Sequence, residues 1–432
     1  MRKNIAIIGS GISGLTCAHF LHSQHNITVF EANDYIGGHT ATKDVEVEGK
    51  RYAVDTGFIV YNDWTYPNFI KLMQKLGVSA QATEMSFSVK NKTQNIEYNG
   101  NTLNSLFAQR RNILRPRFLR IVRDIVRFNK LCKQYLSKKR DTDGQTLMDF
   151  IHTHRLSHDF CYNYILPMCA AIWSTSLAEI KSFPLGFFLR FFNNHGLLNI
   201  TNRPQWYTIV GGSKQYIAPL IQGFADKIQL NRPVMGVVPV QAGDDNAATR
   251  YALTTKSSSA DEHIEYFDEV IFACHSDQAL AMLSQATEQQ RSILGSIPYA
   301  ANEVVLHTDT QVLPKRKLAW ASWNFALSGE AGEQEAPAVL TYNMNILQKI
   351  ESKTAFCVTL NNTKGIAADK ILGIYHYSHP QFNHATIAAQ ERRDEICGQQ
   401  GLHFCGAYWY NGFHEDGVRS ALDVCARFGA TL

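Results

Sequence analysis

Three glycines near the start of the chain have the spacing of a loop that binds a pyrophosphate. Gly9, Gly11 and Gly14 follow the apolar run 5–8, and Glu31 ends the next apolar run. In such a loop the first glycine permits a tight turn, the second lets the backbone approach the phosphates, and the third lets a helix pack closely on the strand. The free N–H groups at the start of that helix attract negative charge. The expected chemistry is the binding of a dinucleotide.

Glu31 narrows the choice of dinucleotide. Its carboxylate is placed to accept hydrogen bonds from ribose hydroxyls, and it would repel the phosphate of a 2′-phosphorylated cofactor. FAD and NAD both remain open on this motif alone. The elements that must position these groups are a buried parallel strand over 5–8, a helix from Ser13 to about residue 23, and a second strand over 27–30.

The composition limits the class of protein. A chain of 432 residues can bury a large core, so we expect two intertwined domains. The nine cysteines show neither a Cys-x-x-Cys pair nor another metal-ligand spacing, which is typical of reduced thiols in a cytoplasmic protein and predicts no metal site. No apolar run approaches the roughly 20 residues of a membrane-spanning helix. The net charge of +4 is small, so only its local distribution is informative.

A second glycine pair favours FAD over NAD. The segment EANDYIGGHTAT, over 31–42, places Gly37 and Gly38 just after the second strand. This segment resembles the second glycine motif of the flavin-containing amine oxidase and phytoene desaturase superfamily, which lies against the FAD pyrophosphate and the flavin. That superfamily usually has an arginine where this chain has His39, which Thr40 follows. The resemblance implies that the segment contacts bound FAD.

Further segments resemble the same superfamily in the same order. They are the turn DTGF over 55–58, WYTIVGGSKQYIAPL over 206–220, IQLNRPVMGV with Val234 at the adenine end, and DEVIFACHSDQAL over 268–280. The C-terminal segment LHFCGAYWYNGFHEDGVRSALDVCARF, over 402–428, resembles the last strand, loop and helix that bind FAD. Its helix, expected to start near Glu415, would direct N–H groups at the electron-rich edge of the flavin and stabilise the anionic reduced form.

The motif and the resemblance together predict a set of residues that bind non-covalent FAD. The set comprises Gly9, Gly11, Ser13, Gly14, Glu31, Ala32, Gly37, Gly38, His39, Thr40, Val234, Gly406, Gly412, Phe413 and Val418. The predicted fold is α/β, with a Rossmann-type FAD-binding domain of the amine-oxidase kind and an interleaved α+β substrate domain. The discontinuous FAD-binding domain would span 1–80, 206–290 and 396–432, and the substrate domain 81–205 and 291–395.

Within the superfamily, the nearest resemblance is to bacterial oxidoreductases, predicted to bind NAD or FAD, that are associated with cyclopropane-fatty-acid-synthase-like enzymes. The matching stretches are GGHT, DTGFIVYN, LAWASWN, TYNMNILQ and CGAYWYNGFHEDG. The association implies an acyl-chain methyltransferase as a possible partner. We recognise no nucleic-acid-binding module, so nucleic acid is not an expected partner.

Aromatic residues crowd the two predicted insertions, for example in FPLGFFLRFFNNHG and LAWASWNFAL. A single aromatic residue more often packs in the hydrophobic core than lines a functional site. Together, however, these residues suggest a large apolar cavity. We therefore hypothesise that a lipid or fatty-acyl substrate is oxidised or desaturated, with hydride transfer to flavin N5 and proton removal by a side chain or ordered water. The candidate catalytic residues are His39, His275, Tyr342, Asn343 and Phe413, with His376 as an alternative acid or base.

The segment 110–140 carries the strongest local charge, with twelve Lys and Arg against the single acid Asp124. Its apolar residues recur at helical spacing, at Phe118, Ile121, Val122, Ile125, Phe128, Cys132 and Tyr135. One interpretation is a basic helix packed on the core with its charged face in water. The other is peripheral docking on the inner face of an anionic membrane, where each basic residue contributes about 1 kcal/mol.

Two other functions remain open. An amine oxidase of this superfamily would act on a small amine and usually has a lysine-held water, for which we can suggest only Lys317. A non-redox flavoprotein, such as an isomerase, would not be reduced by its substrate. His154 and His158 have i,i+4 spacing, which we interpret as one helix face because no third metal ligand is evident.

Overall fold

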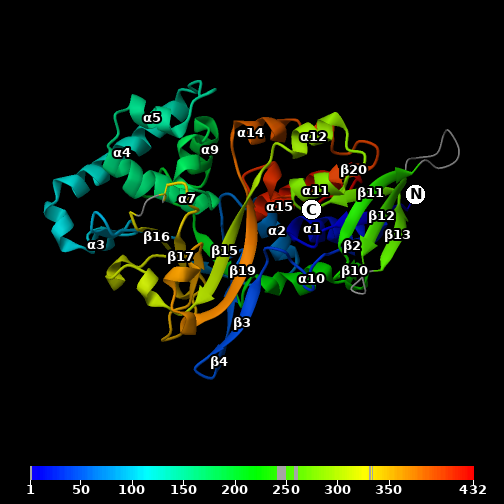
Figure 1. The fold of residues 1–432 in the computed structure, drawn as a ribbon, viewed down its shortest axis with the longest axis horizontal. Helices are drawn as coiled ribbons and strands as arrows, with labels where there is room; N and C mark the ends of the chain where they lie inside the picture. The colour runs from blue at the N-terminus through cyan, green and yellow to red at the C-terminus, as the bar shows by residue number, and fades with distance from the viewer. Residues whose placement is uncertain (1, 241–249, 257–260, 330–331, 333) are drawn as a thin grey trace.

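One half of the molecule is built on a sheet of five parallel strands, in the order β10-β2-β1-β14-β20 (Figure 1). The computed structural model describes residues 2–240, 250–256, 261–329, 332 and 334–432. The strand bounds are β1 (Asn4–Ile8), β2 (Asn26–Phe30), β10 (Ile228–Gln229), β14 (Glu269–Phe272) and β20 (Leu402–Phe404). Strands β1, β14 and β20 are almost wholly buried, as expected for a parallel sheet covered on both faces.

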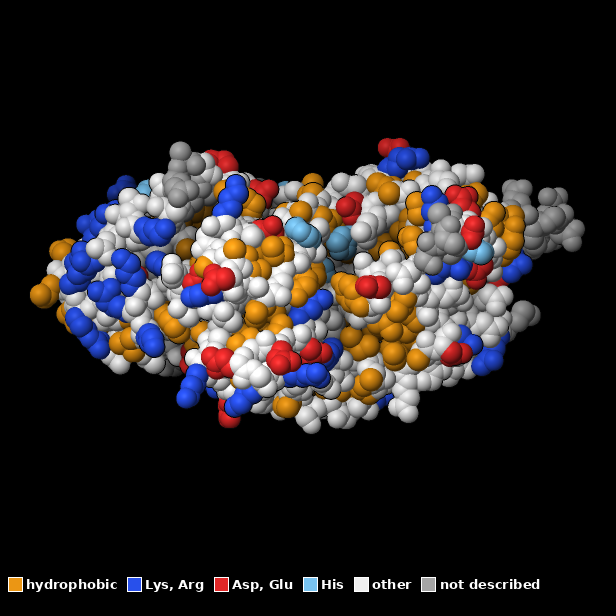
Figure 2. Space-filling view, turned by 60° about the horizontal axis from the view of Figure 1, so that its bottom comes forward, with side chains coloured by type: hydrophobic (Ala, Val, Ile, Leu, Met, Phe, Trp, Pro, Cys, Tyr) orange, Lys and Arg blue, Asp and Glu red, His pale blue; other side chains and the backbone are white. Residues whose placement is uncertain are grey.

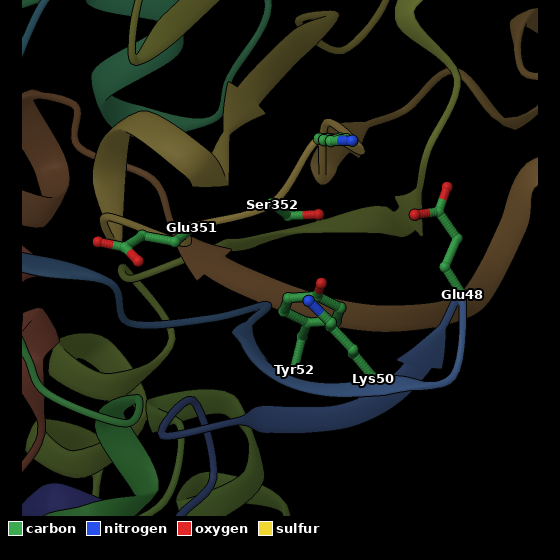
Figure 3. A pocket seen from close by; sticks show the side chains of 6 residues that line it. Glu48, Lys50, Tyr52, Glu351 and Ser352 are labelled. Atoms are coloured by element: carbon green, nitrogen blue, oxygen red, sulfur yellow. The ribbon is translucent and has the colours of Figure 1, made fainter.

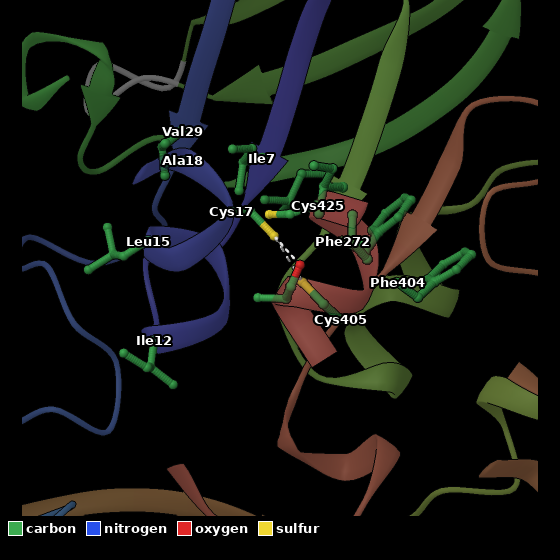
Figure 4. Close-up of a cluster of buried hydrophobic side chains, with 14 of the residues drawn as sticks. Ile7, Ile12, Leu15, Cys17, Ala18, Val29, Phe272, Phe404, Cys405 and Cys425 are labelled. Carbon is green, nitrogen blue, oxygen red and sulfur yellow. Dashed lines mark hydrogen bonds between the residues drawn. The ribbon is translucent and has the colours of Figure 1, made fainter. Parts of the chain in front are cut away.

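Two helices from opposite ends of the chain pack together in this half, among the apolar side chains of Figure 4. They are α1 (Ile12–Leu21) and α15 (His414–Arg427). The hydroxyl of Ser13 donates to the carbonyl of Gly417 over 3.0 Å, and a Cβ at Gly417 would lie only 2.7 Å from Cγ2 of Ile12. Glycine at position 417 therefore allows the close approach of the two helices.

Small antiparallel sheets and helices surround the parallel sheet. The sheets are β3 (Thr42–Val47) with β4 (Lys50–Asp55), β5 (Val60–Asn62) and β6 (Ala80–Thr83) on either side of β9 (Trp206–Ile209), and β11 (Val234–Val240), β12 (Arg250–Lys256) and β13 (Glu262–Phe267). The helices are α2 (Pro67–Lys75), α10 (Ile217–Ile221), α11 (Ser276–Met282), α12 (Glu288–Leu294) and α14 (His384–Glu391).

The other half combines a sheet of seven strands with a lobe of short helices (Figure 1). The sheet has the order β19-β15-β18-β17-β16-β7-β8. Its bounds are β7 (Phe87–Asn91), β8 (Ile96–Asn99), β15 (Tyr299–His307), β16 (Trp323–Leu327), β17 (Leu340–Asn343), β18 (Cys357–Leu360) and β19 (Ile371–Pro380), with α13 (Met344–Leu347) after β17. The helical lobe comprises α3 (Leu103–Leu106), α4 (Pro116–Ser137), α5 (Leu147–Thr153), α6 (His158–Phe160), α7 (Leu166–Trp173), α8 (Leu177–Lys181) and α9 (Leu185–Asn194).

The predicted α/β fold is confirmed, because strands from three distant parts of the sequence form one parallel sheet. The strands of the seven-stranded sheet lie within the two predicted insertions, although the domain boundaries themselves stay predictions. The interpretation of His154 and His158 as one helix face is wrong. The helix α5 ends at Thr153, and Arg155 has a φ of +49°, so the two histidines belong to different helices.

The basic segment forms a 3-10 turn over Arg110–Leu114 followed by α4. Its expected apolar face is confirmed: Phe118, Ile121, Phe128 and Cys132 are buried, and Val122, Ile125 and Tyr135 pack against the same core. Among the helices of the described ranges, none combines the length and hydropathy that crossing a bilayer requires.

Candidate functional site

The glycines of the loop after β1 serve two different purposes. A Cβ at Gly9 would lie 2.7 Å from the carbonyl oxygen of Ala273, and one at Gly14 would lie 2.0 Å from the carbonyl oxygen of Gly9. These two glycines are therefore needed for packing within the protein. Gly11 has an ordinary φ of −69°, and no described atom lies within 4 Å of where its Cβ would be. Gly11 thus leaves space for a ligand directly before α1, whose first N–H groups lack a side-chain cap among the described residues.

The second glycine pair lies directly against this loop. The N–H of Gly37 donates to the carbonyl of Ser10 over 3.1 Å, and Gly37 forms a parallel bridge with Gly11. A Cβ at Gly38 would lie 3.4 Å from Cα of Gly11. The φ angles of Gly37 and Gly38, +122° and +56°, are ones that L side chains rarely adopt. The two motifs therefore form one continuous backbone surface.

The carboxylate of Glu31 lies beside the same surface. One oxygen accepts from the N–H and the hydroxyl of Ser10 over 3.0 and 2.7 Å, and the other accepts from the N–H and the side-chain amide of Asn33 over 2.9 and 2.8 Å. Two of these four donors are side chains that can rotate away, so the carboxylate can exchange them for ribose hydroxyls. The N–H of Arg232 donates to the carbonyl of Glu31 over 2.8 Å, which places Val234 of β11 two residues from this contact. Ala32 is exposed.

The turn after β4 supports the segment that carries His39. The N–H of Phe58 donates to the carbonyl of His39 over 2.8 Å, and a Cβ at Gly57 would lie 2.2 Å from that carbonyl oxygen. The buried carboxylate of Asp55 accepts from the N–H and hydroxyl of Ser213, each over 2.9 Å, and from the side-chain amide of Gln348 over 2.9 Å. Burial raises the pKa of Asp55 to about 6, although hydrogen bonds from Thr42 and Ser213 oppose the shift. Asp55 therefore joins the turn to two distant segments.

We expect Asp55→Ala to lower the free energy of unfolding by about 3–5 kcal/mol, because it leaves several buried donors without an acceptor. The matched control is Asp44→Ala, which removes an exposed carboxylate whose ion pair with Lys214 lies at the surface. That change should cost at most about 1 kcal/mol. Urea denaturation of both variants measures the difference, and equal effects would contradict the role given to Asp55.

The C-terminal loop meets both halves of the molecule at Phe413, whose ring packs against both hydrophobic cores. The N–H of Phe413 donates to the carboxylate of Asp416 over 2.9 Å, and burial raises the pKa of Asp416 to about 7. The helix begins at His414, one residue before the expected start, and the Glu415 carboxylate accepts from the N–H of Phe69 over 2.8 Å. The loop itself runs from Gly406 and includes Gly412, with φ of +92°, whereas the predicted Val418 is buried within α15.

Three histidines from distant segments gather next to the glycine surface. The ring centroid of His39 lies 6.4 Å from that of His275 and 5.5 Å from that of His379. Burial lowers the pKa of His39 to about 3 and that of His379 to about 4, and it also lowers the pKa of His275. All three imidazoles are therefore neutral near pH 7, and the lowered pKa values make His39 and His379 weak bases. Nε2 of His39 is buried without a hydrogen-bond partner in the described part of the chain.

A second polar group joins the glycine segment to the C-terminal helix. Nε2 of His414 lies 2.9 Å from the hydroxyl of Tyr216 and 3.2 Å from that of Thr40. The His414 ring stacks on Phe58 with centroids 3.7 Å apart, and burial lowers its pKa to about 3. This group brings together residues 40, 58, 216 and 414 of the sequence.

Sequence reasoning missed His379 and His414. Residues 375, 377 and 379 alternate on one face of β19, so the candidate His376 lies on the other face and is exposed. The alternation of these residues was visible in the segment IYHYSHP, but the sequence does not show which face of the strand points inward. His414 directly follows the predicted Phe413 and could have been added as the first residue of the helix.

The structure does not place Tyr342 and Asn343 in the histidine group. The Tyr342 ring packs against Trp323 with centroids 5.3 Å apart, and the Asn343 side chain caps α13. Lys317 is exposed, with its ammonium 5.8 Å from the centroid of Trp320. Catalytic roles for Tyr342 and Asn343 stay predictions without support from these contacts.

Two surface cavities have different surroundings. The first, of about 380 Å³, lies at the β3-β4 hairpin and is lined by Glu48, Lys50, Tyr52, Glu351, Ser352 and Lys353 (Figure 3). Its lining contains none of the predicted site residues. The second, of about 430 Å³, borders the predicted site through Phe413, with Trp64, His195 and Asp416 also in its lining. Histidine side chains are also visible in the hollow between the two halves in Figure 2.

The residues present fit a bound FAD. Gly11 leaves room for a pyrophosphate, Glu31 offers a carboxylate for the ribose, and the unpartnered Nε2 of His39 offers a polar group next to them. Thr40 and Tyr216 supply further hydroxyls on the same side of the glycine segment. The individual contacts of these residues with FAD stay predictions.

Comparisons with known proteins agree with this geometry. The family model of flavin-containing amine oxidoreductases matches residues 12–347. The solved structure of cyclohexylamine oxidase from Brevibacterium oxydans IH-35A is similar with a TM-score of 0.67 and 14% identity, covering 99% of this chain and 98% of that one. A CLA-producing fatty acid isomerase from P. acnes is similar with a TM-score of 0.65 and 13% identity, with the same coverage. At such identities the two structures show the fold alone. The search of curated proteins finds no match.

Proposed function

The chain belongs to the family of flavin-containing amine oxidoreductases and is an FAD-dependent oxidoreductase, and we propose that it oxidises or desaturates a hydrophobic, acyl-chain substrate. Bound FAD supplies the acceptor for the hydride that the substrate loses. The observation that carries the proposal is a series of aromatic rings that leads from the C-terminal loop into the helical lobe.

This aromatic series begins at Phe413. Its ring stacks on Phe191 of α9 with centroids 5.4 Å apart, and Phe191 lies 4.8 Å from Trp173 of α7. The ring centroid of Trp173 lies in turn 4.4 Å from that of Phe183. Phe191, Trp173 and Phe183 are each 4% exposed and belong to the hydrophobic core, so a ligand beside Phe413 would lie against an apolar wall. Such a wall favours an apolar ligand through burial of the ligand's surface area rather than through charge. The series supports an apolar substrate whose reacting carbon lies near Phe413.

The histidine group supports the removal of a proton from the same substrate. Loss of a hydride and a proton from adjacent carbons leaves a double bond, so the chain must provide a base. His275 is the best candidate, because its ring is neutral and lies at the carboxyl end of β14, stacked on Tyr299 with centroids 4.2 Å apart. Burial lowers the pKa of His39 to about 3 and that of His379 to about 4, so both are weak bases and less suited to this role.

Oxidation of a small amine is the second candidate. The cavity of about 430 Å³ combines Trp64 and Phe413 with the carboxyl groups of Glu415 and Asp416, a combination that can bind an ammonium group. Burial raises the pKa of both carboxyl groups, and both already accept hydrogen bonds from backbone N–H groups. The two carboxyl groups of this cavity therefore attract a cation less strongly than two free carboxylates would. The fold occurs both in an amine oxidase and in a fatty acid isomerase, so it does not select among these functions.

Anaerobic mixing of the FAD-loaded protein with candidate substrates tests the proposal. We expect acyl phospholipids or free fatty acids to bleach the flavin absorbance, with one new double bond or oxidised carbon formed for each flavin reduced. Cyclohexylamine and putrescine are the amine controls. Bleaching by an amine but not by acyl lipids would overturn the proposal in favour of amine oxidation. Conversion of an acyl lipid to an isomer without bleaching would instead assign a non-redox isomerase.

A further inference from the structure

We infer that the outer face of the helical lobe docks on an anionic lipid bilayer. The basic face is defined here as the exposed side of residues 110–137, which comprise the turn Arg110–Leu114 and α4. In Figure 2, basic side chains gather over the end of the molecule that carries α3 and α4 in Figure 1. This inference goes beyond the proposed function, because headgroup binding at this end does not depend on which substrate is oxidised.

The charge of this segment is almost entirely positive and directed to solvent. Of the twelve Lys and Arg over 110–140, eleven are exposed and Arg115 is half-buried. The one acid, Asp124, is buried and accepts hydrogen bonds from the Arg123 guanidinium and the Ser157 N–H, each over 3.0 Å. It therefore offers little compensating charge at the surface.

Four of the basic residues on α4 have no acidic partner in the part of the chain that the structure describes. The ion pairs of α4 join Arg117 to Asp159 and Arg123 to Asp124. Within the described ranges, no carboxylate lies within 4.0 Å of the other basic residues of the helix, which are Arg120, Arg127, Lys130 and Lys133. A structural surface helix usually mixes both signs of charge, whereas this one leaves its cations available for an external anion.

Apolar side chains project from the same basic face. Leu119 and Val126 are 43% and 51% exposed and lie two helical turns apart, so they share a face with the intervening Arg123. Leu114, directly before the helix, is 86% exposed, and Leu103 of α3 is 78% exposed. Exposed leucines among unpaired cations fit a bilayer, whose headgroups attract the charges and whose acyl boundary accepts the leucines. Nucleic acid would use the charges but leave the leucines in water.

The position of this face in the fold is consistent with delivery of an apolar ligand. Helix α4 packs against α9, which carries Phe191 of the aromatic series, and the Phe128 ring lies 5.9 Å from that of Phe188 on α9. The side of α4 opposite the basic face thus contacts the helix that leads to Phe413. Docking would place this end of the molecule against the lipid surface.

Cosedimentation with vesicles tests the inference. The FAD-loaded full chain is mixed at low ionic strength with vesicles of phosphatidylcholine and phosphatidylglycerol in equal parts, and separately with pure phosphatidylcholine vesicles. The variant Arg120→Gln/Arg127→Gln/Lys130→Gln/Lys133→Gln removes the four unpaired charges. The matched control, Lys71→Gln/Lys227→Gln/Arg291→Gln/Lys364→Gln, removes four exposed charges from other elements.

We expect the wild-type protein and the control to bind the anionic vesicles, and the α4 variant to bind at least about 100-fold more weakly, since each basic residue contributes about fivefold. Leu114→Gln should reduce the binding that survives at high salt. All substituted side chains are exposed, so the flavin spectrum and Tm should not change. Absence of wild-type binding to anionic vesicles, or equal loss in both quadruple variants, would overturn the inference. If single-stranded RNA displaced the protein from the anionic vesicles at a concentration lower than that of the lipid, the basic face would be assigned to nucleic acid instead.

Discussion

The variant Gly11→Ala is expected to fold normally and to lose its FAD. The added methyl group meets no described atom within 4 Å, and the φ of −69° suits alanine, so the protein without cofactor should keep its Tm. The same methyl group would occupy the space in which a pyrophosphate approaches the backbone. A forced contact of this kind costs about 1–3 kcal/mol, which is roughly 5- to 150-fold in Kd for FAD.

The matched variant is Gly14→Ala, in which the new Cβ would lie 2.0 Å from the carbonyl oxygen of Gly9. We expect this change to lower the Tm of the cofactor-free protein, because the clash lies within the fold and not in the ligand space. Flavin absorbance per protein after gel filtration and the Tm of both apoproteins separate the two effects. Full retention of FAD by Gly11→Ala would show that the pyrophosphate does not approach this glycine.

Stability of the cofactor-free chain is expected to fall steeply as the pH is lowered from about 6.5 to 4. Burial lowers the folded-state pKa of five histidines below the ordinary value of 6.5, to about 3 or 4: His39, His195, His307, His379 and His414. A group with a lowered folded pKa contributes stability that is complete above its unfolded pKa and is lost as the pH falls toward the folded value.

Two buried carboxyl groups act in the opposite direction. Burial raises the pKa of Asp55 to about 6 and that of Asp416 to about 7, so their contribution is complete below their ordinary pKa of 3.8 and is lost as the pH rises through the folded values. Near pH 5 the unfolded chain thus binds five more protons at the histidines and two fewer at the carboxyl groups. For these seven groups, the net difference of roughly three protons corresponds to about 4 kcal/mol per pH unit.

Urea denaturation over a series of pH values measures this slope. Removing the buried His195 by His195→Asn should reduce the slope by about one proton, or about 1.4 kcal/mol per pH unit. The exposed His263 provides the control, and His263→Asn should leave the slope unchanged. A free energy of unfolding that is constant between pH 6.5 and 4.5 would contradict the buried, neutral state of these histidines.

The cofactor side of the site was accessible to sequence reasoning because its signals are local. The spacing of Gly9, Gly11 and Gly14 reflects a turn, a ligand space and a helix contact within a few residues of chain. The pair Gly37 and Gly38 is similarly constrained by backbone conformation. Such constraints limit which amino acids are allowed, so they are visible in the sequence of a single protein.

The substrate side was less accessible because its residues come from distant segments. Tyr342 and Asn343 were chosen from a strand in the predicted substrate domain, and the strand order directs them to Trp323 and α13 instead. His379 went unrecognised because the face of β19 that points inward depends on pairing with β15. No local pattern specifies such a pairing.

The sequence by itself determined the α/β class, the dinucleotide-binding loop and the amphipathic nature of the basic segment, since each depends on periodicity or on glycine spacing along a short stretch. The flavin family followed from the resemblance of several such stretches to a known superfamily. The tertiary structure alone decided that His39, His275 and His379 form one group, because three separate segments bring them together near the carboxyl end of β14. It also decided that α4 buries one face against α9 and leaves in solvent Leu119, Val126 and the four cations without an acidic partner among the described residues. Burial and charge pairing are properties of surfaces in contact, and only the folded chain defines those surfaces.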